Sequence, residues 1–264
     1  WTDATYVENG VISGTMATDS DGFYASDFGS GTGWYGPAKK RALSELLQDF
    51  QAQIHVENLN LNGQMGMIEV YFLDVNDNVV AKLGIEDAWK DVARMQAKFQ
   101  LGTPSNRHSI YGHPERHSHW YNYRGIMRIE RIGQEFKAKF AIIEGGMHKH
   151  EVELTYTDHD NEYQTPIAQI QVAIRRRTAN PTQMRINHIY VNKLNHEPNG
   201  VPYIANPGDK IIFNHQTRDV YLNGESVPFD FGADFFTLKK GFNSLVVLPE
   251  GVFDTKVRFR EKFR

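Results

Sequence analysis

Short stretches in which apolar and polar residues alternate recur along most of this chain, and residues typical of turns separate them. Residues 126–132 read IMRIERI, residues 136–143 alternate in the same way, and residues 148–156 place Val152 and Leu154 on one face. Such stretches return at a spacing of roughly ten residues, which is the pattern of a β-sandwich or a β-barrel. The sequence therefore predicts an all-β fold.

Further strands are expected before and after these segments. Residues 67–73 and 79–85 read as a hairpin, because residues 74–78 (DVNDN) between them are turn formers. The other strands expected in this part of the chain are residues 11–15, 50–56, 93–101, 167–175 and 184–191.

One short helix is expected in addition. The segment AKKRALSELLQDF follows Pro37, and its leucines and phenylalanine fall at helical spacing. Proline suits the first turn of a helix. The apolar side of this helix would pack against the core.

A change of composition predicts a domain boundary late in the chain. Residues 194–209 are rich in Pro, Asn and Gly, which indicates a linker. Short strands are expected beyond it, at residues 210–213, 219–222, 244–248 and 255–259, and Asn223-Gly224 is a strong hairpin signal. We therefore divide the chain into residues 1–196 and 197–264.

Composition excludes several classes of function. The chain has 264 residues and no cysteine, so it has no disulfide, thiol nucleophile or thiolate metal site. Its 29 basic and 32 acidic residues give a formal charge of -3, which argues against a nucleic-acid partner. No apolar run of about 18 residues is present, so no membrane-spanning helix is expected. The chain begins Trp1-Thr2-Asp3, and we expect it to be part of a longer protein.

Residues 19–43 predict a shaped loop that could bind a ligand. Five glycines, three aspartates and several aromatic rings lie close together there, and glycine lets the backbone turn tightly. Rings can stack on the apolar face of a sugar, and carboxylates accept bonds from its hydroxyls. The candidate saccharide-binding residues in this loop are Asp21, Trp34 and Tyr35. The alternative is a long loop whose rings pack into the core.

A second polar loop, residues 101–125, combines rings with donors. Its candidate saccharide-binding residues are His113, Arg116, Trp120 and Tyr123. Here too the alternative is a loop that covers one face of the sandwich, with its rings buried, because cores and interfaces both enrich Trp and Tyr.

Signatures of catalysis are missing. A retaining glycosidase needs two carboxylates about 5–5.5 Å apart, which on a strand calls for acids two residues apart. The pairs with that spacing, Glu151/Glu153 and Asp158/Asp160, read as a solvated strand face and as a turn. No nucleophile, metalloprotease or phosphate-loop motif occurs. We predict no catalytic residues, no enzyme activity and no cofactor.

Two kinds of segment have residues that could ligate a metal ion. His117 and His119 could share one strand face, but no acid of known metal-site spacing accompanies them. Residues 19–21 and 74–78 have the oxygen-rich texture of a calcium loop and serve equally well as turns. We predict no metal site, with bound calcium left open.

The end of the chain carries a specific motif. A V-Y-L-N-G segment is followed by G-x-D-F-F-x-L-x-x-G-x-N-x-L. The residues concerned are Val220-Tyr221-Leu222-Asn223-Gly224, Gly232, Asp234-Phe235-Phe236, Leu238, Gly241, Asn243 and Leu245. This pattern resembles the C-terminal domain of siphophage distal tail proteins, called Dit. The resemblance implies a smaller, galectin-like C-terminal β subdomain.

The first three quarters carry a broader resemblance. It rests on residues 23–24, 29–37, 49–50 and 69–74, which read FY, GSGTGWYGP, DF and EVYFLD. They resemble the carbohydrate-binding modules inserted in enlarged, evolved Dit proteins. This implies a jelly-roll or concanavalin-like β-sandwich.

Together the resemblances imply a structural protein of the virion at the phage tail tip. Its expected partners are host cell-wall polysaccharide, other phage tail proteins and, in the full-length protein, further copies of itself in a homo-hexamer. The expected function is non-covalent binding of host saccharide during adsorption. The alternatives are a purely structural baseplate module and a sandwich-fold glycan hydrolase.

Overall fold

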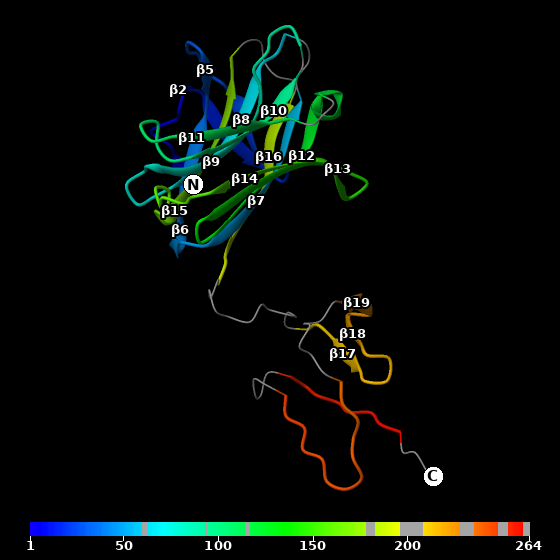
Figure 1. Ribbon diagram of the computed structural model, residues 1–264. Coiled ribbons are helices and arrows are strands. Elements are labelled where there is room, and N and C mark those ends of the chain that lie inside the picture. Colours follow the sequence, from blue (N-terminus) through cyan, green and yellow to red (C-terminus); the bar gives the residue numbers. More distant parts are fainter. Residues whose placement is uncertain are drawn as a thin grey trace. The chain divides into compact units, whose positions relative to one another are not determined.

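The computed structural model describes residues 1–59, 63–92, 94–113, 117–177, 183–195, 208–227, 235–247 and 253–260 (Figure 1). The chain separates into two compact units, Trp1–Pro198 and Asn199–Arg264. Each is described by itself.

The first unit is a sandwich of two antiparallel sheets, with one parallel pair, β2 and β5. In the nine-stranded sheet the order is β1-β6-β15-β8-β9-β10-β11, and β5 also pairs with β15 while β2 pairs with β5. In the seven-stranded sheet the order is β14-β13-β12-β7-β16-β4-β3. The first sheet contains β1 (Thr2–Asp3), β2 (Gly10–Ile12), β5 (Trp34–Gly36), β6 (Ala38–Leu47), β8 (Gly66–Leu73), β9 (Val79–Asp87), β10 (Met95–Leu101), β11 (His108–Gly112) and β15 (Ile167–Arg176). The second contains β3 (Thr15–Asp19), β4 (Gly22–Asp27), β7 (Phe50–Leu59), β12 (Asn122–Ile132), β13 (Glu135–Glu144), β14 (Met147–Thr157) and β16 (Gln183–Lys193). The predicted all-β sandwich is confirmed.

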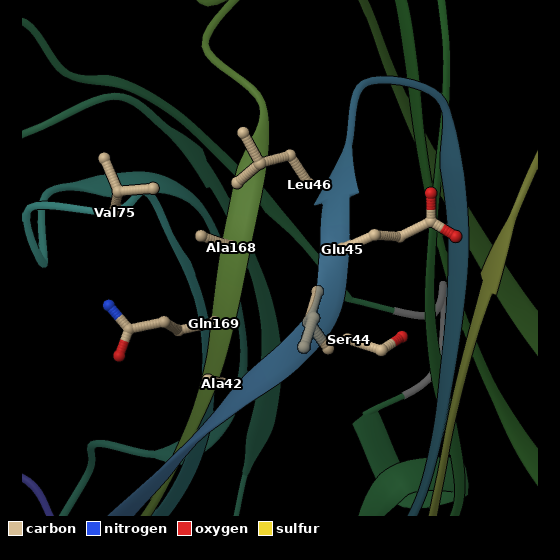
Figure 2. A pocket seen from close by; sticks show the side chains of 8 residues that line it. Ala42, Ser44, Glu45, Leu46, Val75, Ala168 and Gln169 are labelled. Atoms are coloured by element: carbon tan, nitrogen blue, oxygen red, sulfur yellow. The ribbon is translucent and has the colours of Figure 1, made fainter.

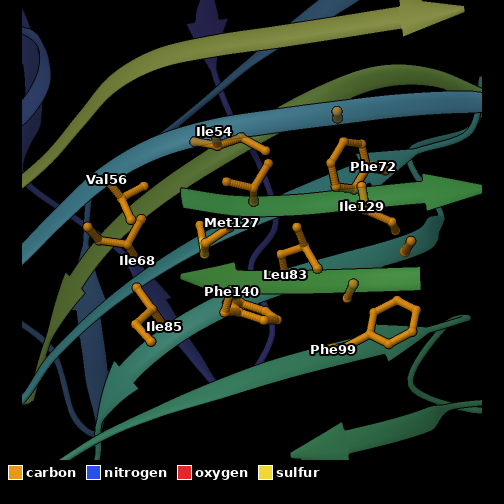
Figure 3. Close-up of a cluster of buried hydrophobic side chains, with 14 of the residues drawn as sticks. Ile54, Val56, Ile68, Phe72, Leu83, Ile85, Phe99, Met127, Ile129 and Phe140 are labelled. Atoms are coloured by element: carbon orange, nitrogen blue, oxygen red, sulfur yellow. The ribbon is translucent and has the colours of Figure 1, made fainter. Parts of the chain in front are cut away.

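The core lies between the two sheets and follows from the alternation in the sequence. On β7, Phe50, Ala52 and Ile54 are fully buried, and the residues between them are partly exposed. Figure 3 shows Ile54 of one sheet in the same cluster as Phe72 and Leu83 of the other. The polar residues between them therefore lie on the outer face of the sandwich.

The nine-stranded sheet is covered on its outer face as well. All residues of β8 and β9 are buried, because the segment that includes Ala4, Val7 and Glu8 packs on their outer side. Charged groups under this segment pair with one another: Lys82 with Glu8 and Glu69, and Arg175 with Glu69.

The predicted helix after Pro37 is wrong, because these residues form β6. That strand pairs with β15 from Ala38 onward, and the register shifts between Gln169↔Ala42 and Ile167↔Leu47. The shift leaves residues 43–46 opposite Ala168 alone, an irregularity that the helical spacing of the leucines does not reveal. Pairing with β15 outweighs the weak helical preference of the segment.

The second unit contains a three-stranded antiparallel sheet of β17 (Ile211–Asn214), β18 (Asp219–Leu222) and β19 (Glu225–Val227). Asn223 and Gly224 turn the chain with φ of 53° and 95°, which confirms the predicted hairpin. The strands expected at residues 244–248 and 255–259 are not found: 244–247 and 255–259 are not in strands, and residue 248 lies outside the described residues. A strand needs a neighbour to pair with, and the described residues of this unit supply none there.

Candidate functional site

The loop predicted at residues 19–43 is wrong for most of its length, because these residues pair as β4, β5 and the start of β6 and only short connections lie between the strands. Near the connection from β4 to β5, two rings of this glycine-rich segment pack on an arginine of β15. The guanidinium of Arg176 lies over the rings of Phe28 and Tyr35, at 5.0 and 5.2 Å from their centroids. Trp34 and Tyr35 are half-buried in β5. Asp21 is exposed in the turn between β3 and β4, where its carbonyl accepts a bond from Asn187 Nδ2 at 3.0 Å. Tyr35 thus has a packing role in addition to any role in binding.

The rings of the second loop require a correction. Trp120 and Tyr123 are both 0% exposed, so a saccharide cannot stack on them in this structure, and we remove them from the candidate site. The indole Nε1 of Trp120 donates to the carbonyl of His150 at 3.0 Å, and the Tyr123 hydroxyl donates to the carbonyl of Ile126 at 2.6 Å. Both polar groups are satisfied inside the protein, which is why these large rings can be buried.

The other two candidate residues of the second loop are His113 and Arg116. His113 is exposed at the end of β11. Arg116 lies outside the described residues.

The sheet topology separates the predicted residues instead of gathering them. Trp34 and Tyr35 lie on β5, which pairs with β15, while His113 follows β11 at the far edge of the same sheet. Four strand spacings separate β15 from β11, or about 19 Å. Asp21 belongs to the other sheet. The structure therefore does not join the four into one site.

A compact group of polar side chains instead occupies the outer face of the seven-stranded sheet. His55 on β7 is directly opposite His188 on β16, and Gln53 is opposite both Arg128 on β12 and Tyr190 on β16. The ring of His55 lies 5.8 Å from that of His188 and 6.0 Å from that of Tyr190. We call these five residues the sheet-face cluster.

Hydrogen bonds fix the orientation of three members of the sheet-face cluster. Arg128 donates to Gln53 Oε1, with Nε at 2.9 Å. The Gln53 amide nitrogen is then left to face His55 Nε2 at 3.0 Å. Because the amide nitrogen can only donate, this bond needs a neutral His55. Burial lowers the pKa of His55 from 6.5, and the nearby His188 and His148 lower the pKa further, which favours that neutral form.

Beside the cluster lies a small apolar floor. Met127 and Ile129 of β12 point into the core, so Ile126 between Gly125 and Met127 points outward. Ile126 and its cross-strand neighbour Ala141 nevertheless have 0% exposure. Longer side chains around them therefore cover this floor. A ligand on this face would therefore contact the covering polar side chains and the ring of Tyr190, which is 50% exposed, and not the floor itself.

A second surface feature is a shallow hollow where β6 bends. Figure 2 shows the side chains that line it from β6, β15 and the turn after β8: Ala42, Ser44, Glu45, Leu46, Val75 and Gln169. It has no aromatic ring. Glu45 is paired with Lys193 and Gln169 donates to Asp77, so two of the polar side chains of the hollow are already engaged. We do not regard it as the binding site.

The described residues contain neither a metal-binding cluster nor a membrane-spanning helix. No group of three or more His, Asp or Glu side chains is arranged to hold a metal ion within the part of the chain that the structure describes. No helix among these residues is long and apolar enough to cross a membrane.

Comparison with known families then identifies one part of the chain. Residues 175–263 match the family described as siphovirus-type tail component, C-terminal domain. The predicted resemblance to a siphophage tail component is confirmed. The matched segment begins inside β15 and includes β16, so it reaches into the sandwich unit. No curated protein matches this sequence.

Solved structures show the fold of the sandwich. The CBM2 module of the evolved Dit of Lactobacillus casei BL23 phage J-1 has a TM-score of 0.57 at 14% identity, over 69% of this chain and 80% of that one. A tetrameric galectin from the ball sponge Cinachyrella sp. has a TM-score of 0.41 at 10% identity, over 58% and 98%. The carbohydrate-binding module CBM66 of Bacillus subtilis has 0.35 at 11%, over 69% and 92%. The likeness to the phage module therefore supports the predicted sandwich.

Proposed function

We propose that this chain is part of a phage tail-tip protein whose sandwich unit binds host cell-wall polysaccharide without altering it. Two findings support the proposal: the tail-component match at residues 175–263 and the fold shared with a module of an evolved Dit. The observation that carries it is the sheet-face cluster, where the ring of Tyr190 is accessible beside the guanidinium of Arg128, which Gln53 orients, and the imidazole of His188.

The chemistry of the cluster suits a sugar. An exposed ring can pack on the apolar face of a pyranose, and the neighbouring imidazole and guanidinium groups can bond its hydroxyls. The bond from Arg128 to Gln53 holds the guanidinium in place before a ligand arrives, so less side-chain freedom is lost on binding. The loop residues Asp21, Trp34, Tyr35 and His113 remain candidates for a separate contact.

The partners follow from the tail-component match. We propose that the second unit contacts other tail proteins and that the full-length protein is a homo-hexamer. Several copies of one weak site would then engage the same wall, and multivalency raises the overall affinity without any new contact.

The structure favours binding over hydrolysis. Glu151 pairs with Lys139 at 2.7 Å and Glu153 with Lys137 at 3.6 Å. The carboxylate of Asp158 accepts bonds from the backbone nitrogens of Glu162 and Tyr163, both at 2.9 Å. These acids therefore hold the protein together, and neither spaced pair presents two free carboxylates.

Labelling of host cells by a fluorescent fusion of the chain tests the proposal. Tyr190→Ala should reduce labelling at least fivefold, if a sugar on this ring gains about 1–3 kcal/mol as a stacked base does. Tyr111→Ala is the matched control, because Tyr111 is equally exposed, at 54%, on the other sheet. Trp34→Ala examines the glycine-rich loop in the same assay.

The outcomes separate the alternatives. If the parent chain labels no host cells, the protein is a structural tail module only. If Tyr111→Ala or Trp34→Ala removes labelling and Tyr190→Ala does not, saccharide is bound elsewhere on the sandwich. Release of soluble sugar from the wall would instead show an enzyme.

A further inference from the structure

Most carboxylates on the outer face of the seven-stranded sheet are already bonded within the protein. Glu135, exposed at the start of β13, is an exception among the described residues. Glu151 is bonded by Lys139, Glu153 by Lys137, Asp19 by Arg185, Glu130 by the Gln51 amide at 2.9 Å and Glu57 by the Gln183 amide. A ligand that approaches this face thus meets few free acceptors.

Donors remain available on the same face. Arg124 and Arg128 project from the outer side of β12, and neither makes an ion pair with any residue that the structure describes. The bonding partner of Arg128 is the neutral amide of Gln53. A guanidinium has five N–H donors, so each of these arginines keeps free donors. Glu57 lies directly across from Arg124 on β7, and the partner of its carboxylate is the Gln183 amide.

The two arginines flank the covered apolar floor. Four residues of strand place their Cα atoms about 13 Å apart, with Ile126 between them. Long side chains can converge from both ends of that span on one group above Ile126. His55 lies directly across from Ile126 on β7, and His188 is the next residue in the same row on β16.

We infer that the saccharide held on this face carries an anionic group, a phosphodiester or a carboxylate, which Arg124 and Arg128 bind above Ile126. This rests on the proposed saccharide-binding function and goes further, since it names the chemical class of the ligand. Arginine binds both anions through paired, charge-assisted hydrogen bonds, which are the strong ones. His55 and His188 line the side of the site toward β16, where they can donate to the remaining oxygens.

The full chain, as a fluorescent fusion, tests this on host cells. Arg124→Gln/Arg128→Gln should label cells at least tenfold less than the parent. Arg41→Gln is the matched control, because Arg41 is an exposed arginine on β6 of the other sheet and makes no ion pair among the described residues. Soluble poly(glycerol phosphate), polygalacturonate and neutral dextran are then added as competitors at equal monomer concentration.

Displacement of the fusion by poly(glycerol phosphate) points to a phosphodiester, and displacement by polygalacturonate to a carboxylate. High salt should weaken labelling, because the Debye length shortens. The inference is overturned if dextran competes as well as the anionic polymers, if no anionic polymer competes, or if the double arginine variant labels like the parent. In each of these cases the proposed saccharide binding still holds if the parent chain labels cells. If the parent chain labels no cells, both the saccharide binding and the anionic ligand are refuted.

Discussion

Replacement of Arg175 by methionine tests how the covered outer face of the nine-stranded sheet is stabilised. Arg175 Nη2 pairs with Glu69 inside the protein, and both side chains are almost without exposure, at 0% and 2%. Glu69 also accepts from the Tyr71 hydroxyl at 2.7 Å, and Lys82 Nζ lies 3.3 Å from its other oxygen. Arg175→Met removes the main counter-charge and keeps most of the apolar volume.

The expected magnitude follows from the carboxylate. Burial alone would raise the pKa of Glu69, but Arg175 and then Lys82 outweigh it and lower the pKa from 4.5 to about 2. That difference corresponds to about 3 kcal/mol of stability. It is present above pH 4.5 and is lost as the pH falls toward 2. Removal of one partner of a buried pair costs about 3–5 kcal/mol, so Arg175→Met should lower the free energy of unfolding by about 3 kcal/mol at neutral pH.

Urea unfolding followed by tryptophan fluorescence measures this directly. The four tryptophans of the chain, Trp1, Trp34, Trp89 and Trp120, all lie in the sandwich unit, so the signal reports on that unit alone. Arg176→Met is the control, because Arg176 lies over two rings and makes no described ion pair; about 1 kcal/mol should be lost. A loss below 1 kcal/mol for Arg175→Met would refute the reasoning.

Three further perturbations have defined outcomes. Trp120→Ala should destabilise the sandwich by about 3–5 kcal/mol in the same unfolding assay, because a fully buried indole leaves a cavity; a loss near zero would mean that the ring is not in the core. Gly125→Ala should lower the yield of folded protein, since an added Cβ would lie 2.0 Å from the carbonyl oxygen of Ala141. The pKa of His55 is lowered from 6.5 in the folded state, so the unfolded chain binds its proton first and stability should fall as the pH drops below 6.5. In His55→Gln this fall should be smaller, and an unchanged slope of unfolding free energy against pH would contradict the assignment.

The alternation of apolar and polar residues was enough to predict many of the strands. Residues 126–132 and 136–143 could be assigned because each strand has one side in the core, and the Asn223-Gly224 hairpin because its turn needs two positive φ angles. The segment after Pro37 could not, since its leucines happen to fall at helical spacing and its pairing with β15 is irregular.

The candidate site was harder to predict for a physical reason. His55, Arg128 and Tyr190 lie on strands far apart in sequence, and only the order β12-β7-β16 brings them together. Alternation marks each of them as outward-facing but does not say which strands are neighbours. Trp120 and Tyr123 were misassigned because a polar loop sequence conceals that their indole and hydroxyl groups bond buried carbonyls.

The most direct test of saccharide binding on the outer face of the seven-stranded sheet is an NMR titration of the isotope-labelled chain with purified wall polysaccharide of the host. We expect the largest shift changes in the side chains of His55 and His188 and in the backbone of β7, β12 and β16 around them. Changes confined to residues 29–35 or to β10 and β11, or none at saturating saccharide, would contradict it.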